Sequence, residues 1–224
     1  MNILLETCGR VLVIAPHPDD EVLGAGGTIA RLAAAGNEVY VAIVTEGKPP
    51  AFPPETVRRV QEEAGKAHAL LGVKETFGLG LPAAGLSETA HSELNTALFG
   101  LVSKLRPKTI FVPFVGDMHI DHQLIFTSAM VAARPHFENY PELILAYETL
   151  SETNWNAPYI TPQFTPNVFI DISEWLETKQ CFGSQVREPP HERSLATLRA
   201  LATLRGATVF KSAAEGFVLV RHVL

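Results

Sequence analysis

The sequence contains only two cysteines, Cys8 and Cys181, and they lie far apart in its 224 residues. Such a pair forms no disulfide framework, so we expect a protein of a reducing, cytoplasmic compartment. No apolar run reaches the roughly 18 residues that a membrane span needs. The first residues also lack a basic segment followed by an apolar stretch and a small-residue cleavage site, and we therefore expect no signal peptide.

The sequence also has no excess of positive charge. The chain has 18 Lys and Arg residues against 24 Asp and Glu residues, a formal net charge of -6. A mildly acidic chain without a Lys/Arg run is a poor candidate for binding nucleic acid or an anionic membrane. Apolar residues make up 46% and charged residues 19%, close to globular averages, which excludes intrinsic disorder and fibrous repeats. Since no linker or internal repeat is found, we expect residues 1–224 to form one domain.

Short β-rich apolar runs alternate with helical patterns along the chain. The predicted strands span Arg10–Pro16, Val39–Thr45, Glu75–Leu79, Thr109–Pro113, Leu143–Tyr147, Val168–Ile172 and Gly216–Arg221. The predicted helices span Val22–Ala35, Glu55–Leu71, Glu88–Leu105, Asp121–Ala133, Trp175–Phe182 and Leu195–Arg205. Regular alternation over the first 133 residues predicts the α/β class, a three-layer sandwich with helices on both faces of a mainly parallel sheet.

A first group of ionisable residues, His17, Asp19, Asp20 and Glu21, follows the first predicted strand directly. In open α/β sheets, ligands bind at this carboxyl edge. His17 and Asp20 supply an imidazole and a carboxylate, which both bind a divalent metal near neutral pH. A helix cap would explain one of the acids, but it requires neither a second acid nor a histidine.

A second group follows the strand Thr109–Pro113, at the same edge of the sheet. His119 and His122 are three residues apart, so a helix start would place them on one face, beside Asp121. Core packing does not explain such a cluster, which favours a metal or catalytic role. The isolated histidines are expected to be ordinary core or surface residues: His68, His91, His136 and His222.

The two groups together supply more ligands than a catalytic zinc needs, since such a site has three protein ligands and one open position. His17, Asp20 and one of His119 or His122 would form that set. The remaining groups would then supply a base and an oxyanion donor, as metal-assisted hydrolysis requires. A dinucleotide-binding fingerprint at Gly24–Gly27 fails, because its third glycine would be at position 29, which is Ile29. We expect these glycines to allow close packing of a helix on the sheet.

The run VLVIAPHPDDEVLGAGGTIARLAAAGNEVYVAIVTEG, together with the later HIDH, resembles the PIG-L/LmbE family of zinc-dependent N-deacetylases. The family signature, [A/P]-H-P-D-D-E after the first strand and a later H-x-D-H, is present in order. The resemblance is closest over residues 10–47 and 107–125, and SQVREPPHERS and AAEGFVLVR look like the family's tail. It implies a Rossmann-like fold, one Zn²⁺ or other divalent ion per chain, and N-acetylglucosaminyl conjugates cleaved to acetate and the free amine.

The resemblance also implies a role for each matching residue. The metal ligands would be His17, Asp20 and His122. Asp19 would be the general base, and a protonated His119, paired with and oriented by Asp121, would stabilise the tetrahedral oxyanion.

The C-terminal tail supplies the candidate substrate contacts. Arg193 is the first candidate, followed by His191 and Arg187, with a solvated surface charge as the alternative for each. Gln185 and Glu215 are further residues that would shape the site, and Trp155 would either stack on a sugar or anchor its loop.

Several functions and assignments stay open. The alternatives to a deacetylase are a metal hydrolase of another amide or ester, a phosphoesterase and a non-catalytic metal-bearing module. The physiological metal, the group attached to the sugar and the oligomeric state, including a homo-oligomer, are also undetermined.

Overall fold

A computed structural model of the chain describes residues 9–136, 138–179 and 187–224; Cys8, Cys181 and Gln185 lie outside the described residues. Seven strands form one sheet in the order β3-β2-β1-β4-β5-β7-β6. The strands are β1 (Arg10–Ala15), β2 (Glu38–Glu46), β3 (Glu75–Pro82), β4 (Thr109–Pro113), β5 (Leu143–Tyr147), β6 (Val168–Asp171) and β7 (Ala214–His222). The helices are α2 (Asp20–Ala34), α3 (Pro54–Leu71), α4 (His91–Leu105), α5 (Ile120–Ala132), α6 (Leu176–Lys179) and α7 (Leu195–Thr208), with a 3-10 turn, η1 (Leu86–Glu88).

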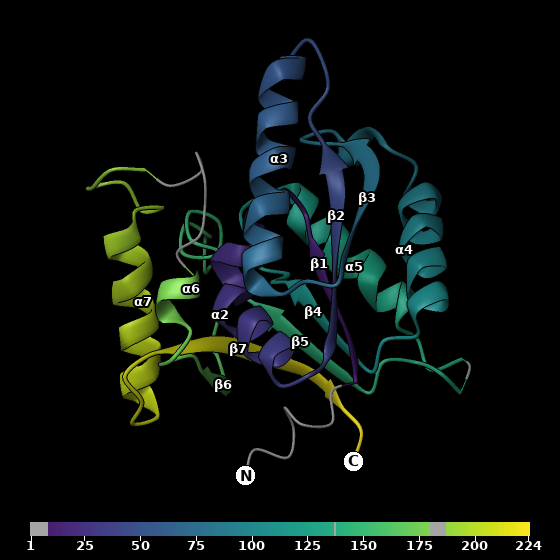
Figure 1. The fold of residues 1–224 in the computed structure, drawn as a ribbon. Helices are drawn as coiled ribbons and strands as arrows, with labels where there is room; N and C mark the ends of the chain where they lie inside the picture. Colours follow the sequence, from purple (N-terminus) through teal and green to yellow (C-terminus); the bar gives the residue numbers. More distant parts are fainter. Residues whose placement is uncertain (1–8, 137, 180–186) are drawn as a thin grey trace.

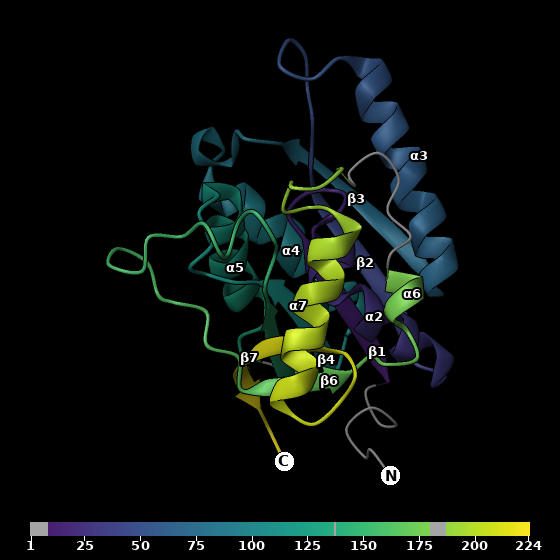
Figure 2. The same cartoon turned by 90° about the vertical axis from the view of Figure 1, so that its left-hand side faces the viewer.

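The sheet is mainly parallel, which confirms the predicted α/β class. Strands β1 to β5 pair in parallel, and β7 runs antiparallel to both β5 and β6. Alternate residues of β1 point to opposite faces: Val11 and Val13 join a core with α2, and Leu12 and Ile14 join a core with α4 and α5. The sheet therefore lies between two helical layers (Figure 1; Figure 2).

Three predicted boundaries differ by three residues from those of the structure. Helix α7 runs on to Thr208 instead of ending at Arg205. Strand β3 runs on to Pro82 instead of ending at Leu79, because it continues along β2 beyond a register shift. Helix α4 begins at His91, not at Glu88, since the preceding residues form η1. The predicted helix Trp175–Phe182 ends outside the described residues, and its described part is α6. Among the helices that the structure describes, none has the length and apolar character needed to cross a bilayer.

Helix α2 lies unusually close to the sheet because glycines face its neighbours. A Cβ atom on Gly24 would be 2.2 Å from the Tyr147 ring, and one on Gly27 would be 2.8 Å from Ile172. Larger residues would push the helix away from the sheet. The expectation that these glycines allow close packing is confirmed.

A buried ion pair also fixes α2. The Glu215 carboxylate on β7 accepts hydrogen bonds from the backbone N–H groups of Gly27 and Thr28, at 2.9 and 2.7 Å. Lys179 Nζ donates to Glu215 and to the carbonyl of Leu23. The pair joins α2, α6 and β7, and it holds the helix whose N-terminus carries Asp19 and Asp20.

Candidate active site

The two predicted groups meet because β1 and β4 are adjacent parallel strands that end at the same edge. The His17 ring lies 4.8 Å from that of His119 and 5.4 Å from that of His122, measured between ring centroids. His122 Nε2 is 3.2 Å from Asp20 Oδ2. Segments about 100 residues apart thus build one cluster.

Two overlapping sets of side chains place their ligand atoms within 4.8 Å of one another. The first is His17, Asp20 and His122, and the second is His17, His119 and Asp121. In the first set, Asp20 Oδ1 is buried without a hydrogen-bond partner, and the buried His122 Nε2 lies 3.2 Å from Asp20 Oδ2 without forming a hydrogen bond to it. Buried polar atoms rarely lack a partner, so this carboxylate oxygen and this imidazole nitrogen fit the ligand atoms of a divalent metal.

The electrostatics of the first set also favour a bound cation. Burial lowers the pKa of His122, but Asp20 and Asp117 outweigh it and raise that pKa to about 10. Burial likewise opposes the charge on His17, yet hydrogen bonds to Asp121 and Asp20 raise its pKa to about 9. Burial raises the pKa of Asp20, but His122 and His17 hold it well below its usual range. The cluster thus stabilises positive charge, as protons or as a metal.

Asp117 is a site residue whose role the sequence pattern did not indicate. Its Oδ2 lies 2.8 Å from His122 Nδ1, and its Oδ1 accepts a hydrogen bond of 2.6 Å from the Thr153 hydroxyl. A carboxylate on Nδ1 fixes the imidazole tautomer and directs Nε2 outward, an arrangement common behind metal-binding histidines. The only signal in the sequence was the position of Asp117 within GDMHIDHQ.

Asp19 lies at the N-cap of α2, but its side chain makes no capping hydrogen bond. Its carboxylate instead accepts a hydrogen bond of 2.7 Å from Arg193 Nη1, and Arg193 Nε donates to the Ser151 hydroxyl at 2.7 Å. Burial and the charge of Asp20 raise the pKa of Asp19 to about 7, against the lowering effect of Arg193. A carboxylate that titrates near neutral pH is suited to general base chemistry.

The predicted pairing of His119 with Asp121 stays a prediction: their ligand atoms lie within 4.8 Å of each other, but no side-chain hydrogen bond joins these two described residues. His119 Nδ1 accepts a hydrogen bond of 3.1 Å from the backbone N–H of Asp121. The Asp121 carboxylate instead accepts from the Ala84 N–H at 2.7 Å and lies 3.4 Å from His17 Nε2. Burial and the charge of His17 lower the pKa of His119, against the raising effect of Asp121. The lowered pKa favours the neutral imidazole of His119, and the N–H that Nδ1 accepts leaves the proton on Nε2.

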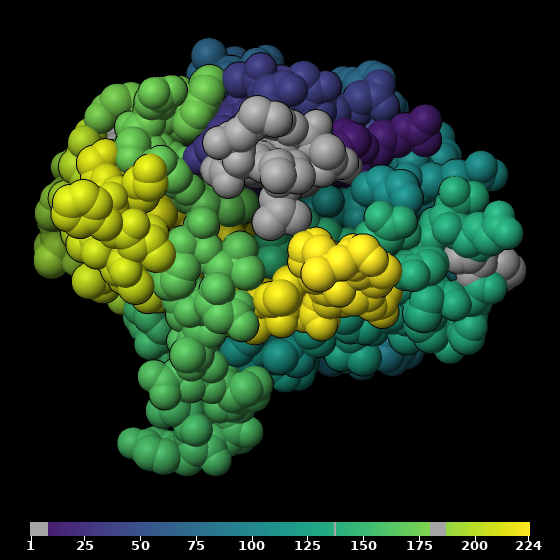
Figure 3. All heavy atoms as spheres, turned by 90° about the horizontal axis from the view of Figure 1, so that it is seen from below, coloured from purple at the N-terminus to yellow at the C-terminus, as the bar shows by residue number. Residues whose placement is uncertain are grey.

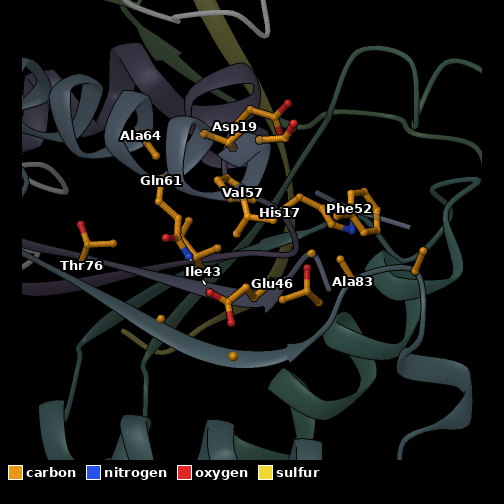
Figure 4. A pocket seen from close by; sticks show the side chains of 18 of the residues that line it. His17, Asp19, Ile43, Glu46, Phe52, Val57, Gln61, Ala64, Thr76 and Ala83 are labelled. Atoms are coloured by element: carbon orange, nitrogen blue, oxygen red, sulfur yellow. Dashed lines mark hydrogen bonds between the residues drawn. The ribbon is translucent and has the colours of Figure 1, made fainter. Parts of the chain in front are cut away.

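A cavity of about 700 Å³ opens beside these residues and is lined by His17, Asp19, His119 and Arg193. It continues between α3 and the strands β2 and β3 (Figure 4). Of the three predicted substrate contacts, Arg193 lines this cavity. His191 and Arg187 are exposed, lie outside its lining, and contact the Arg193 segment through hydrogen bonds to its backbone.

His68 and Trp155 differ in burial. His68 is buried, with Nε2 2.8 Å from Glu21 and Nδ1 2.8 Å from Thr76, so the expectation of a satisfied core histidine is confirmed. Trp155 is 55% exposed and lies outside the cavity lining. It belongs to the segment between β5 and β6, which projects from the body of the molecule (Figure 3).

Acids and imidazoles gather at the carboxyl ends of β1 and β4 in this α/β sheet. This arrangement is typical of the class of α/β proteins that bind ligands at the strand ends. Within that class, the chain belongs to the PIG-L family: the family model described as GlcNAc-PI de-N-acetylase matches residues 12–133. The resemblance drawn from the sequence is confirmed.

Two of the similar proteins are named as deacetylases. The diacetylchitobiose deacetylase of Thermococcus kodakarensis is 30% identical over 94% of this chain and 83% of its own length. The N,N'-diacetylchitobiose deacetylase structure from Pyrococcus horikoshii matches with a TM-score of 0.76 and 24% identity, over 98% of this chain and 86% of that chain. A 4-carboxy-2-hydroxymuconate hydratase from Pseudomonas putida shares the fold, with a TM-score of 0.75 and 20% identity over 96% and 98% of the chains. The fold alone thus hosts more than one reaction.

Proposed function

We propose that the protein is a metal-dependent hydrolase that removes the acetyl group from an N-acetylglucosamine-type conjugate, releasing acetate and the free amine. One observation carries this proposal: Asp19, a buried carboxylate with a pKa of about 7, lies beside side chains that fit a divalent metal. The relative named as a diacetylchitobiose deacetylase supports an N-acetylated amino sugar as the substrate class.

We assign the metal to His17, Asp20 and His122, with Zn²⁺ as the first choice, because Asp20 Oδ1 and His122 Nε2 are both buried without a hydrogen-bond partner and Asp117 holds the other nitrogen of His122. Other divalent ions accept the same donors. When bound, the ion would polarise the attacking water and the amide carbonyl.

Asp19 acts as the general base in this mechanism. Arg193 donates to Asp19 Oδ2, so the guanidinium orients the carboxylate while the other oxygen accepts a proton from the attacking water. Asp19 then returns that proton to the amide nitrogen as the C–N bond breaks. Without Arg193, the burial of Asp19 would hold the carboxyl group protonated to a higher pH.

His119 stabilises the negative charge that develops on the carbonyl oxygen. Its Nδ1 is occupied by the backbone N–H of Asp121, so the Nε2–H is the group that donates into the cavity. A neutral imidazole fixed in this way donates a preorganised hydrogen bond to the oxyanion.

We further propose that residues 1–224 form one domain that acts in the cytoplasm. The single seven-stranded sheet supports the first statement, and the scarcity of cysteine supports the second.

Acetate and amine release from a panel of N-acetylglucosamine conjugates tests the proposal, with metal content measured in parallel. We expect Asp19→Asn to keep the metal and to lose about 10²-fold or more in kcat. Asp171→Asn is the matched control, because Asp171 lies on β6 outside the cavity lining. Near-normal turnover by Asp19→Asn would contradict the assigned base, and metal binding without hydrolysis of any conjugate would favour a binding module.

A further inference from the structure

The cavity is longer than the catalytic cluster requires. Its volume of about 700 Å³ falls in the range of roughly 300–1,000 Å³ that encloses drug-sized ligands. Beyond His17 it becomes a trough whose walls are α3 on one side and β2 with β3 on the other (Figure 4). An acetylated sugar ring at the catalytic cluster would leave this trough empty.

The apolar face of helix α3 is packed against the protein core only toward the C-terminal end of the helix. Ala67 and Leu71, near its C-terminal end, are buried in the core. Val57, Val60 and Ala64 lie on the same side of the helix at helical spacing, yet they are only half-buried and line the trough. The apolar face therefore continues past the protein core into open space.

Glycines on both walls of the trough leave open space. A Cβ atom added to Gly78 or Gly80 on β3, or to Gly65 on α3, would meet no atom within 4 Å. All three glycines line the cavity. A β-branched residue would stabilise the strand at Gly78, where the backbone conformation is unstrained. A glycine at this position therefore weakens the strand and leaves open space in the trough. Apolar atoms that face this open space lack van der Waals contacts, which a bound ligand would supply.

Positive charge is almost absent from the trough. Among the described residues that line the cavity, Arg193 is the only Lys or Arg, and its guanidinium contacts Asp19, Ser151 and Glu152. The charged side chain along the trough is Glu46, which accepts a hydrogen bond of 2.7 Å from Gln61. A phosphate placed here would face the Glu46 carboxylate and would find no free Lys or Arg among the described lining residues.

We propose that the trough binds an uncharged, largely apolar group attached to the acetylated amino sugar, and that the enzyme discriminates against phosphorylated conjugates. The apolar wall of α3 packs on this group, and Gln61 and Glu46 supply hydrogen bonds to a neutral polar substituent. This inference rests on the proposed function and names the substrate class of the same site.

The test compares three substrates of the metal-loaded enzyme: N-acetylglucosamine, its phenyl β-glycoside and N-acetylglucosamine 1-phosphate. We expect kcat/KM for the phenyl glycoside to exceed that of the free sugar by about tenfold or more, which corresponds to about 1.4 kcal/mol. We expect the 1-phosphate to be the poorest of the three. N-octanoylglucosamine is included as a fourth substrate, because preferential turnover of that compound would place an acyl chain in the trough and overturn the inference.

Two variants localise the effect. Ala64→Leu fills the trough and should lower the ratio of phenyl glycoside to free-sugar kcat/KM about tenfold. Ala69→Leu makes the same change on the exposed side of α3 and should leave the ratio unchanged. A ratio unaltered by Ala64→Leu, or a preference for the 1-phosphate, would refute the inference.

A direct binding measurement separates this inference from the proposed function. Titration of the phenyl glycoside into each full-length protein should show about tenfold weaker binding to Ala64→Leu than to Ala69→Leu. If that difference appears while no substrate releases acetate, the trough assignment stands and the proposed function fails. Equal affinities for the two variants would refute the trough assignment whatever the turnover.

Discussion

Asp117→Asn should weaken metal binding without removing any of the proposed metal ligands. The substitution keeps the side-chain shape behind His122 and removes its charge. Asp117 and His122 are both fully buried, and their contact of 2.8 Å is a charge-assisted hydrogen bond. A hydrogen bond to a charged group contributes about 1.5–3 kcal/mol, and a neutral one contributes about 0.5–1.5 kcal/mol. The difference, about 1–1.5 kcal/mol, corresponds to roughly tenfold weaker metal binding.

Competition with a metal-chelating dye measures this affinity, and thermal denaturation verifies that the variant folds. Asp171→Asn again provides the control, because it makes the same chemical change on β6, outside the cavity lining. Roughly tenfold is the low end of the 10- to 100-fold range seen when the hydrogen-bond partner of a ligating histidine is removed. A folded Asp117→Asn protein with unchanged metal affinity would refute the reasoning about His122.

Three further outcomes follow from the cluster and its supports. The pKa values of His17 and His122 are raised to about 9 and about 10, so both imidazoles are protonated at pH 7 and must lose a proton to bind a metal. Metal affinity should therefore rise with pH, and a pH-independent Kd would contradict this expectation. Lys179→Met leaves the buried Glu215 carboxylate with its two backbone hydrogen bonds but without its cationic partner, and should lower the free energy of unfolding by roughly 3–5 kcal/mol. Lys108→Met breaks an exposed pair and should lower it by less than about 1 kcal/mol; thermal denaturation measures both. Arg193→Met removes the charge that lowers the pKa of Asp19, so the acidic limb of the pH–kcat/KM profile should move to higher pH; an unmoved limb would show that Arg193 does not act through Asp19.

The sequence predicted the fold wherever a short apolar run had clear ends. Strands β4 and β5 coincide with the predictions Thr109–Pro113 and Leu143–Tyr147. The meeting of the two ionisable groups was predictable as well, because both follow strands of one parallel sheet and such strands present their carboxyl ends at one edge. Local pattern and topology were therefore sufficient to place the cluster.

The contacts within the cluster were not predictable, because they depend on side-chain direction across long sequence separations. Arg193 reaches Asp19 from 174 residues away, and Thr153 holds Asp117 across 36 residues. The backbone N–H of Ala84 donates to the Asp121 carboxylate, and Ala84 has a φ of 55°, which a sequence pattern does not reveal in a non-glycine residue. The trough was equally hidden, since a glycine within a strand is also typical of a bulge.

The choice between the two overlapping ligand sets is the central claim, and metal stoichiometry tests it directly. We would measure metal content per chain in the wild-type protein, His122→Ala and His119→Ala after identical loading and desalting. If His17, Asp20 and His122 bind the ion, the wild type and His119→Ala will hold about one metal per chain, and His122→Ala will hold almost none. A metal retained by His122→Ala and lost from His119→Ala would assign the site to His17, His119 and Asp121 and contradict the account.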